Sequence, residues 1–465
     1  MPNPIQLRGK RVLVVGLART GVATALFCAV RLAEVTATDL RAEAEIPETG
    51  KLRMNGVALH LGRHDEGILD RQDLVVSSPG VPANAPLLAH ARARGITVWS
   101  EIELAYRFLR DDCRLIGITG SNGKSTTTTL VAHILAGAGL PTVLAGNIGI
   151  PLVSVVDQLE RNSLVVAELS SFQLELIESF RPHISVFLNL TPDHLDRHGS
   201  LDAYTRAKAR IFENQLPEDA AVLNADDAAT VAVAPRGPRL YWFSREKSPD
   251  AGAYLRGDEI VFRSDRSRAD EVLFRRQEIP LPGNHNLENV LAAVAAARLA
   301  GAQAEAIASG VRTFGGVEHR LEFVAEISGV GYYNDSKATN VDATLKALDA
   351  FPGRILVILG GKDKGSDYTP LRKPLREKGV LALLIGAAAG KIESQIAGSV
   401  AIDRVDTLDR AVESARHAAR RGDVVLLAPA CASFDQFQNY EHRGRVFKEL
   451  VHHLERQAAT GSPGK

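Results

Sequence analysis

The segment of residues 115–128 combines residue types that bind the phosphates of a nucleotide. It reads LIGITGSNGKSTTT: a β-branched apolar run, a glycine-rich turn, and a Lys-Ser pair where a helix is expected to begin. Gly120 and Gly123 allow backbone N–H groups to close around a phosphate, and Lys124 adds a positive charge. The hydroxyl of Ser125 can join the ligand shell of a Mg²⁺ ion. The segment therefore predicts a phosphate-binding loop.

This loop departs from the strict phosphate-loop pattern at one position. The pattern requires a glycine five residues before Gly123, where Ile118 stands. A purely structural strand-to-helix turn with an incidental Lys-Ser pair is the alternative. Because the strand, turn and helix signals all occur in order, the sequence favours an ATP or GTP site.

A second glycine-containing turn, residues 16–21 (GLARTG), follows the apolar run 11–15. It would match a dinucleotide fingerprint only with glycine at position 18, where alanine stands, so a tight turn that packs a helix is an equal alternative. Asp39 follows about 20 residues later, where an acid can accept hydrogen bonds from a ribose or a base. A solvated turn aspartate explains Asp39 equally well.

Bound ATP needs a metal ion, so ligands are expected near the ends of neighbouring strands. Glu168 ends the apolar run 164–167, and His194 follows the run 184–190. Residues at the carboxyl ends of parallel strands face the ligand crevice. Together the two residues favour a Mg²⁺ site, whereas His198 is expected at the surface.

Three stretches repeat a pattern of short buried strands followed by alanine-rich helices, which is typical of parallel α/β layers. The expected strands are residues 11–15, 115–118, 164–167, 184–190, 355–359, 381–385 and 424–428. The less apolar segment 236–276, with the short runs 241–243 and 259–262, is expected to form an antiparallel edge. The tail from residue 458 is expected to be disordered.

Length and charge exclude several classes of protein. The 465 residues require two or three domains, because single cores stop growing beyond about 250–300 residues. The 55 basic residues balance the 55 acidic residues, so no general field attracts nucleic acid or an anionic membrane. The three distant cysteines give neither a disulfide framework nor a zinc cluster, and no apolar run is long enough to span a bilayer. A cytoplasmic protein is expected.

Several segments, in order along nearly the whole chain, resemble the Mur ligase family of bacterial cell-wall synthesis. They are SNGKST (121–126), GNIG (146–149), ELSSFQ (168–173), TPDHLD (191–196), GNHN with Asn289 (283–289), EHR (318–320) and GGK (360–362). Two further segments, DSKATNVDAT (335–344) and SFDQFQNY (433–440), resemble the branch of the family that adds D-glutamate.

The resemblance implies an α/β protein of three domains. A Rossmann-like N-terminal domain, residues 1–103, would bind the UDP end of a substrate. A central P-loop ATPase domain with a mainly parallel sheet would span residues 104–315. A Rossmann-like C-terminal domain, residues 316–465, would bind the amino acid.

The resemblance also implies a role for individual residues. Those implied for ATP are Gly120, Ser121, Asn122, Gly123, Lys124, Ser125, Thr126, Asn286, Asn289, Arg320 and Asp335. Those implied for the UDP substrate are Thr20, Asp39, Ser78, Asn147 and His194. Those implied for D-glutamate are Lys337, Thr339, Lys364, Ser433, Phe434 and Tyr440. The implied catalytic set is Lys124, Asn147, Glu168, His194 and Lys208, and the implied ligands of two Mg²⁺ ions are Ser125, Glu168, His194 and Lys208.

Lys208 matches the family's lysine that is carbamylated by CO₂. A carbamate turns this cation into an anion that can orient a second Mg²⁺ ion or its waters. An ordinary lysine on a helix surface is the alternative.

The implied activity is an ATP-driven amide ligation that adds D-glutamate to UDP-N-acetylmuramoyl-L-alanine through an acyl phosphate. The alternatives are another Mur-type or folylpolyglutamate-type ligase, or a P-loop regulatory protein that binds a nucleotide without turnover. The expected partners are the small-molecule substrates alone, with no nucleic acid and no membrane insertion, and the chain is expected to be a monomer.

Overall fold

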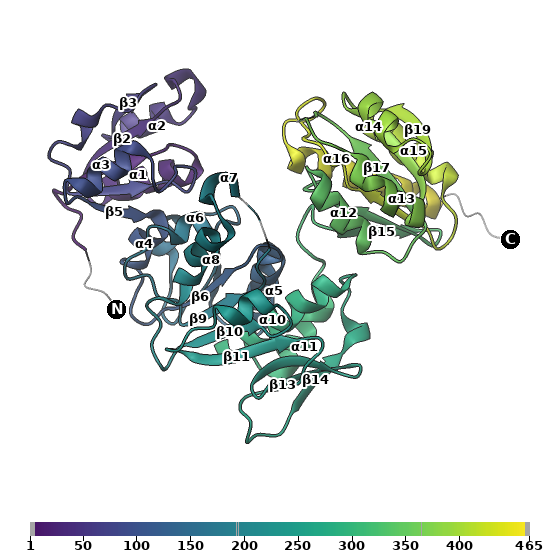
Figure 1. Cartoon of the computed structure of the whole chain (residues 1–465), viewed down its shortest axis with the longest axis horizontal. Coiled ribbons are helices and arrows are strands. Elements are labelled where there is room, and N and C mark those ends of the chain that lie inside the picture. The colour runs from purple at the N-terminus through teal and green to yellow at the C-terminus, as the bar shows by residue number, and fades with distance from the viewer. Residues whose placement is uncertain (1–4, 192, 194, 364, 461–465) are drawn as a thin grey trace. The chain divides into compact units, whose positions relative to one another are not determined.

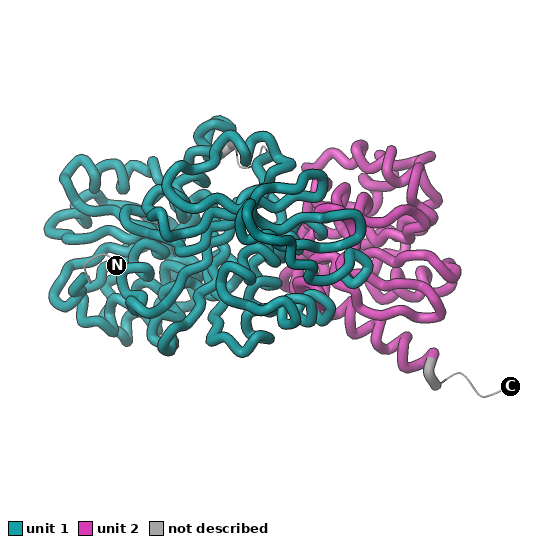
Figure 2. The backbone as a smooth tube through the Cα atoms, turned by 90° about the horizontal axis from the view of Figure 1, so that it is seen from below, with its two compact units in different colours: residues 1–279, 287–313 teal, residues 280–286, 314–465 magenta. Residues whose placement is uncertain are grey.

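A computed structural model of the chain describes residues 5–191, 193, 195–363 and 365–460. It contains three β-sheets flanked by helices, in the order of the chain (Figure 1). The described residues fall into two compact units, 1–279 with 287–313, and 280–286 with 314–465 (Figure 2). The α/β class and the three-domain architecture are as expected, and the limits at residues 103 and 315 stay predictions.

The N-terminal sheet has five parallel strands in the order β3-β2-β1-β4-β5. The strands are β1 (Arg11–Val15), β2 (Glu34–Asp39), β3 (Ala58–Leu61), β4 (Leu74–Ser77) and β5 (Thr97–Ser100). Strand β1 is buried on both faces, which explains its continuous apolar sequence. Alternate residues of β1 pack with helix α1 (Arg19–Val30) and with helix α3 (Pro86–Ala93). The strand order reverses between β1 and β4, which is where ligands bind in open α/β sheets.

The central sheet has nine strands in the order β14-β13-β12-β11-β10-β9-β6-β8-β7. The strands are β6 (Arg114–Thr119), β7 (Thr142–Gly146), β8 (Leu164–Glu168), β9 (Ile184–Phe187), β10 (Ala220–Asn224), β11 (Arg239–Ser244), β12 (Gly252–Arg256), β13 (Glu259–Arg263) and β14 (Glu271–Arg275). The helices are α4 (Glu101–Tyr106), α5 (Lys124–Gly137), α6 (Ser171–Leu174), α7 (Leu195–His198), α8 (Leu201–Ala209), α9 (Ala228–Ala232), α10 (Asn284–Ala300) and α11 (Ala304–Thr313). Strand β6 lies between β8 and β9, so the loop after β6 is at the centre of the carboxyl edge.

One sequence-based expectation for this sheet is wrong. Residues 241–243 belong to β11, which pairs in parallel with both β10 and β12. Only the pairs β12–β13 and β13–β14 are antiparallel, as expected for residues 259–262. The alternation of the short run 241–243 does not distinguish a parallel strand from an antiparallel one, because both place successive side chains on opposite faces.

The N-terminal and central sheets of the first unit share one hydrophobic core. Helix α4 joins them, and all six of its residues are buried. Two of these residues are glutamates. Glu101 Oε1 accepts a hydrogen bond from the Val153 backbone N–H (2.7 Å), and the carboxylate of Glu103 accepts from backbone N–H groups that include Phe180 (2.8 Å). These buried carboxylates therefore connect α4 to loops of the central sheet.

The C-terminal sheet has six strands in the order β15-β16-β20-β17-β18-β19, and only β15 is antiparallel to its neighbour. The strands are β15 (Glu322–Ile327), β16 (Val330–Asn334), β17 (Ile355–Gly360), β18 (Gly379–Ile385), β19 (Ala401–Asp406) and β20 (Val424–Leu427). Alternate side chains of β17 enter two cores. One is completed by α12 (Val341–Asp349), α13 (Arg372–Lys378) and α14 (Ala389–Ile396), and the other by α15 (Leu408–Ala418) and α16 (Tyr440–Thr460).

Two further observations concern the helices. Helix α16 continues to Thr460, so the expected disorder from residue 458 is wrong for its first three residues, and residues 461–465 lie outside the described part. Within the described residues, no helix combines the length and the apolar character needed to cross a membrane.

Candidate active site

The glycine-rich loop connects the end of β6 to the start of α5. Gly123 has a φ of 82°, and a Cβ at this position would lie 2.1 Å from Asn289 Oδ1, so the loop requires glycine there. The Nζ of Lys124 donates hydrogen bonds to the carbonyl oxygens of Gly120 (2.7 Å) and Ser121 (2.8 Å). The lysine charge is thus held within the loop, and Thr126 lies in the first turn of α5.

The segment that follows β9 supports the same loop. The Asn122 backbone N–H donates to Asn189 Oδ1 (2.8 Å), and the Ser121 backbone N–H donates to the Asn189 carbonyl oxygen (3.0 Å). Ser121 Oγ donates to the Thr191 carbonyl oxygen (2.9 Å) and lies 3.1 Å from the hydroxyl of Tyr204. These contacts fix the backbone conformation that a phosphate-binding loop needs before the ligand arrives.

Glu168 connects the loop to a neighbouring strand. It ends β8, next to Ile118 of β6, and is almost fully buried. Ser125 Oγ donates to Glu168 Oε2 (2.6 Å), and Asn147 Nδ2 donates to Glu168 Oε1 (2.9 Å). The structure therefore brings together three of the predicted site residues, with oxygen ligands of the kind that Mg²⁺ prefers.

Lys208 lies against the other side of the loop. Its helix, α8, is capped by Ser200, whose Oγ accepts a hydrogen bond from the Ala203 backbone N–H (3.1 Å). Lys208 is 1% exposed, and its Nζ donates to the Gly120 carbonyl oxygen (2.8 Å). Burial is the main reason why the pKa of Lys208 lies well below its usual value, and the nearby positive charge of Lys124 lowers it further. The surface-lysine alternative is therefore wrong.

Among the described residues, no cage of protein ligands surrounds this edge of the sheet. The described residues contain no group of three or more His, Cys, Asp or Glu side chains that could hold a metal ion. Mg²⁺ is commonly bound by one or two carboxylates, with waters and substrate phosphates completing its octahedron. Glu168 and Ser125 fit that arrangement. Of the other two predicted ligands, Lys208 is buried against the same loop and His194 lies outside the described residues.

The prediction that His198 is a surface residue is wrong. Its side chain is 1% exposed, and its ring stacks on Phe172 at a centroid distance of 5.2 Å. The Nε2 atom lies 3.0 Å from Ser171 Oγ, and Nδ1 lies 3.3 Å from a carboxylate oxygen of Glu175. His198 thus packs α7 against the segment that follows Glu168.

Three of the five residues predicted for the UDP substrate lie at the carboxyl edge of the N-terminal sheet, whereas Asn147 follows β7 of the central sheet and His194 lies outside the described residues. Asp39 ends β2, Thr20 is in the first turn of α1 after β1, and Ser78 directly follows β4. The Ser78 hydroxyl is buried and has no hydrogen-bond partner among the described residues. An unpaired buried hydroxyl is costly, and a ligand at the β1–β4 switch point would satisfy it.

Asp39 is not a solvated turn residue. It is 8% exposed, and its Oδ2 accepts hydrogen bonds from the Leu17 backbone N–H (2.7 Å) and from Arg41 Nη2 (2.8 Å). Burial by itself would raise the pKa of Asp39, but the hydrogen bonds from Arg41 and Leu17 lower it to about 2. In the same turn a Cβ on Gly21 would lie 1.7 Å from the Gly16 carbonyl oxygen, so the turn packs α1 tightly.

Three loops of the second unit carry the residues predicted for the amino acid. They follow β16, β20 and β17, which are adjacent parallel strands, so the loops meet at one edge of the sheet. Lys337 and Thr339 follow β16, and the Lys337 Nζ lies 5.6 Å from the centre of the Tyr440 ring. Ser433, which is buried, and Phe434, which is 65% exposed, follow β20. Lys364, after β17, lies outside the described residues.

Arg320 and Asp335 are predicted to reach the nucleotide from this unit, which also contains Asn286, a nucleotide residue expected in the central domain. Asp335 is 9% exposed and Oδ1 accepts a hydrogen bond from the Leu321 backbone N–H (3.2 Å). Burial raises the pKa of Asp335 to about 7. The positive charges of Arg320 and Lys337 lower this pKa, but their effect is smaller than that of burial. Asn286 Nδ2 donates to the Pro282 carbonyl oxygen (2.7 Å). Asn289, on the same helix α10, belongs to the first unit.

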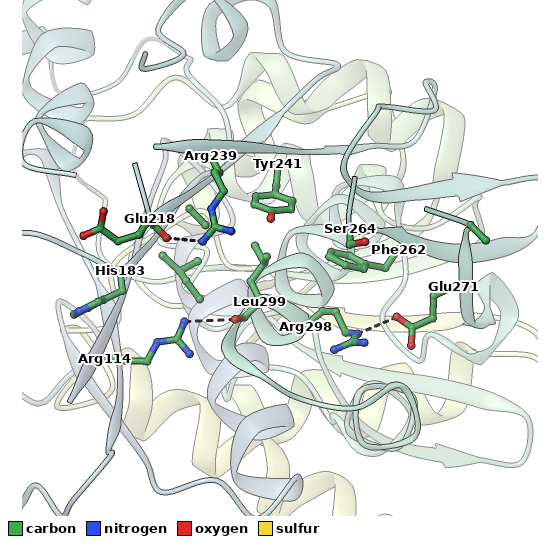
Figure 3. Close-up of a pocket in the computed structure, with 13 residues that line it drawn as sticks. Arg114, His183, Glu218, Arg239, Tyr241, Phe262, Ser264, Glu271, Arg298 and Leu299 are labelled. Carbon is green, nitrogen blue, oxygen red and sulfur yellow. Dashed lines mark hydrogen bonds and ion pairs between the residues drawn. The ribbon is translucent and has the colours of Figure 1, made fainter. Parts of the chain in front are cut away.

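A separate cavity of about 350 Å³ opens at the opposite, amino edge of the central sheet (Figure 3). Two of its three arginines, Arg114 and Arg298, tie the starts of strands to the end of α10, and Arg239 joins the starts of β10 and β11. Arg239 Nη2 donates to the Glu218 carbonyl oxygen (2.6 Å), and Arg298 Nε donates to Glu271 Oε2 (2.9 Å). None of the predicted site residues lines this cavity, so it does not bear on the chemistry at the carboxyl edge.

Models of known families match all three parts of the chain. The Mur ligase MurD-like N-terminal domain matches residues 10–100, the Mur ligase middle domain matches 118–297, and the Mur ligase glutamate ligase domain matches 319–431. The UDP-N-acetylmuramoylalanine–D-glutamate ligase of Acidobacterium capsulatum is 53% identical, covering 96% of this chain and 97% of its own. The chain belongs to the Mur ligase family. The enzyme of the same name from Solibacter usitatus is 52% identical, covering 97% and 99% of the two chains.

Solved structures of Mur ligases share the fold at low sequence identity. MurF ligase from Thermotoga maritima, solved in complex with ADP, has a TM-score of 0.58 at 17% identity and covers 98% of each chain. UDP-N-acetylmuramate-alanine ligase MurC from Thermotoga maritima has a TM-score of 0.57 at 20% identity and covers 96% of this chain and 99% of its own.

Sequence analysis of this Mur ligase missed residues that hold the site in place. Asn189 and Tyr204 contact the phosphate loop, and Arg197 donates through Nη2 to the Val81 carbonyl oxygen (2.7 Å), next to the loop after β4. Asn189 lies two residues after the end of β9, inside the run 184–190 that was expected to form a strand, so a polar residue near a strand end was the available signal. No local signal identifies Tyr204 or Arg197, because their partners are distant in sequence.

Proposed function

We propose that the chain is an ATP-dependent ligase that adds D-glutamate to UDP-N-acetylmuramoyl-L-alanine during synthesis of peptidoglycan precursors. The observation that carries this proposal is the cluster of Ser125, Glu168 and Asn147 beside the phosphate loop, with Lys208 buried against the same loop. The relatives that are about half identical over nearly the full chain bear the name of this activity, which supports the choice of substrates.

In the proposed reaction the terminal carboxylate of UDP-N-acetylmuramoyl-L-alanine attacks the γ-phosphorus of ATP. ADP leaves, and an acyl phosphate forms. The amine of D-glutamate then attacks the acyl carbon, loses a proton, and displaces inorganic phosphate. The first step brings a carboxylate onto a triphosphate, so it requires positive charge in place before the reaction starts. Lys124 and the backbone N–H groups of residues 120–125 supply that charge.

We propose that Ser125 and Glu168 hold Mg²⁺, and that His194 and Lys208 take part in binding a second ion. When bound, the metal neutralises phosphate charge and holds the γ-phosphoryl group in line with the attacking carboxylate. Asn147 orients the Glu168 carboxylate through its hydrogen bond to Oε1 (2.9 Å) and faces the muramoyl substrate. Glu168 thus supplies the fixed negative charge of the site.

We propose that Lys208 is carbamylated. Its burial and lowered pKa favour the neutral amine, whose nitrogen lone pair attacks the carbon of CO₂ to give a carbamate with loss of a proton. The carbamate replaces a buried neutral amine beside Lys124 with an anion. Chemical evidence would be a ¹³C NMR resonance of a carbamate after equilibration with ¹³CO₂, absent from Lys208→Met. Its absence from an active wild-type enzyme under these conditions would refute the modification.

We propose that the second unit binds D-glutamate and assists nucleotide binding. The substrate has two carboxylates, so Lys337 and Lys364 are suitable counter-charges, and the hydroxyls of Thr339 and Ser433 fix its orientation. Tyr440 and the exposed ring of Phe434 border the same loops. We propose that the nucleotide is bound by Asn286, Asn289, Arg320 and Asp335, and the uridine diphosphate by Thr20, Asp39 and Ser78.

Because its substrates are cytoplasmic nucleotides, we place the enzyme in the cytoplasm. We also propose that it acts as a monomer.

The test is ADP release by the purified chain with ATP, Mg²⁺, UDP-N-acetylmuramoyl-L-alanine and one amino acid from a panel. D-glutamate should support turnover, whereas L-glutamate, L-alanine, L-lysine and diaminopimelate should not. Omission of the UDP substrate should abolish ADP release. Turnover with another amino acid would indicate a different ligase of the family, and nucleotide binding without substrate-dependent release would indicate a regulatory protein.

A further inference from the structure

A buried arginine connects two of the three loops at the carboxyl edge of the C-terminal sheet. Arg443, in the first turn of α16, is completely buried. Its Nε donates to Ser336 Oγ (3.0 Å) and its Nη2 to the Ser336 carbonyl oxygen (2.8 Å), in the loop after β16. Nη1 and Nη2 each lie 3.2 Å from the Cys431 carbonyl oxygen, in the loop after β20. Planar guanidinium donors in a fixed fork suit this double attachment, and an ammonium group does not.

A buried tyrosine continues the connection to the third loop. Tyr368 is completely buried, and its hydroxyl donates to Asp363 Oδ1 (2.8 Å), in the loop after β17. The same hydroxyl lies 3.0 Å from Cys431 Sγ. Lys391 Nζ donates to the other oxygen of Asp363 (2.8 Å), so the carboxylate is held from two sides. Cys431 is therefore the residue at which the arginine and the tyrosine meet.

The charge of Arg443 is also unusual for a buried group. Burial lowers its pKa to about 10, which leaves the guanidinium cationic at neutral pH. All the hydrogen-bond acceptors it has among the described residues are carbonyl and hydroxyl oxygens. The charge of Asp435 acts on Arg443, but the Asp435 carboxylate accepts its hydrogen bond from the Ala387 backbone N–H, so a further anion bound nearby would stabilise the buried cation. The loops that it joins carry Lys337, Thr339 and Ser433.

We infer that Arg443 and Tyr368 are positioning residues for the dicarboxylate amino-acid substrate. Arg443 holds the loops of Lys337 and Ser433 together, and Tyr368 holds the loop that leads to Lys364. The described groups proposed to receive the substrate, which include Lys337 and Ser433, are then in place before it binds, which lowers the cost of ordering them. This inference rests on the proposed function, because it concerns the D-glutamate site of that reaction.

Tyr368→Phe is the sharpest test, because it removes only the hydroxyl group and leaves the aromatic ring packed in the hydrophobic core. We expect the KM for D-glutamate to rise about ten-fold, as for loss of a hydrogen bond to a charged group, with the KM values of ATP and the UDP substrate within about two-fold of wild type. Tyr332→Phe is the matched control. Tyr332 is another buried tyrosine of the same unit, in β16, but it packs in the core on the α15 side, near Arg416 and Glu413, whereas Tyr368 belongs to the other core. It should leave all three KM values unchanged.

Arg443→Lys is the second variant, since it keeps the charge and removes the fork that reaches both loops. It should also raise the KM for D-glutamate by about ten-fold or more. Trapping the acyl phosphate with hydroxylamine measures the first step without D-glutamate, and both variants should match wild type there. Thermal unfolding shows whether each variant is folded. If Arg443→Lys does not fold, the result for Tyr368→Phe decides the outcome.

The possible failures can be told apart. If wild type releases ADP without dependence on D-glutamate, the proposed function fails. If wild type depends on D-glutamate but Tyr368→Phe keeps its KM for that substrate, the positioning role is overturned. A fall in kcat with unchanged KM values, or an equal rise in all three, would likewise overturn it, because a general structural defect would have those effects.

Discussion

Glu168→Gln tests whether the charge at the end of β8, rather than its hydrogen bonds, supports catalysis. Glu168 accepts one hydrogen bond on each carboxylate oxygen, from Ser125 (2.6 Å) and from Asn147 (2.9 Å). A glutamine can keep both contacts, because its oxygen can accept from the Asn147 amide while its NH₂ group donates to the Ser125 hydroxyl. The fold should therefore keep its stability, and only the negative charge is lost.

The expected kinetic effect follows from that loss. Removing one fixed electrostatic group from a site costs about 3 kcal/mol of transition-state stabilisation, or about 100-fold in kcat/KM at about 1.4 kcal/mol per factor of ten. The assay is ADP release at several Mg²⁺ concentrations, together with thermal unfolding. Half-maximal activity should require more Mg²⁺ in the variant, because a carboxylate ligand is replaced by a neutral amide.

The matched control is Glu160→Gln, which makes the same chemical change at an exposed position shortly before β8. It should leave the rate and the Mg²⁺ dependence unchanged. If Glu168→Gln unfolds at the wild-type temperature but also retains the wild-type rate and Mg²⁺ dependence, Glu168 is not a metal ligand and the reasoning is refuted.

Three further predictions concern other groups. Because burial raises the pKa of Asp335 from 3.8 to about 7, the folded state keeps a proton that the unfolded state loses. Stability should therefore fall as the pH rises from about 4 to 7, by at most about 4 kcal/mol, and Asp335→Asn should remove this dependence in denaturant titrations; identical pH profiles would contradict it. Lys208→Met should lose about 100-fold or more in activity while the variant stays folded in thermal unfolding, because it removes the carbamate but keeps an apolar side chain of similar length at this buried position; an active Lys208→Met enzyme would exclude a role for the carbamate. Ser78→Ala should raise the KM of the UDP substrate about five-fold through loss of one hydrogen bond, with D-glutamate unaffected; an unchanged KM would place the uridine diphosphate elsewhere.

The parts of the fold that could be predicted are those with local signals. Strands buried on both faces, such as β6 and β17, have continuous apolar sequences, and the phosphate loop has a glycine where φ is positive. Glu168 could be placed in the site because it ends such a strand. The direction of β11 relative to its neighbours could not be predicted. It depends on how the chain connects the strands, and the alternation of apolar and polar residues carries no information on this.

The supporting contacts of the site depend on long-range packing. His198 has a polar sequence environment, yet it is buried because Phe172 and Glu175, far along the chain, provide a stacking surface and a polar partner. Arg443 would be read from the sequence as an exposed residue of a polar helix. Its burial follows from the approach of the loops after β16 and β20 to the start of α16, which only the folded structure reveals.

The central claim is that this chain transfers the γ-phosphoryl group of ATP to the terminal carboxylate of UDP-N-acetylmuramoyl-L-alanine before D-glutamate attacks. The most direct measurement uses that substrate with ¹⁸O at both oxygens of its terminal carboxylate and analyses the released phosphate by mass spectrometry. The account predicts one ¹⁸O atom in each phosphate, because the attacking carboxylate oxygen leaves with the phosphoryl group, together with a product that contains D-glutamate. Phosphate without ¹⁸O, released during formation of the same product, would contradict it.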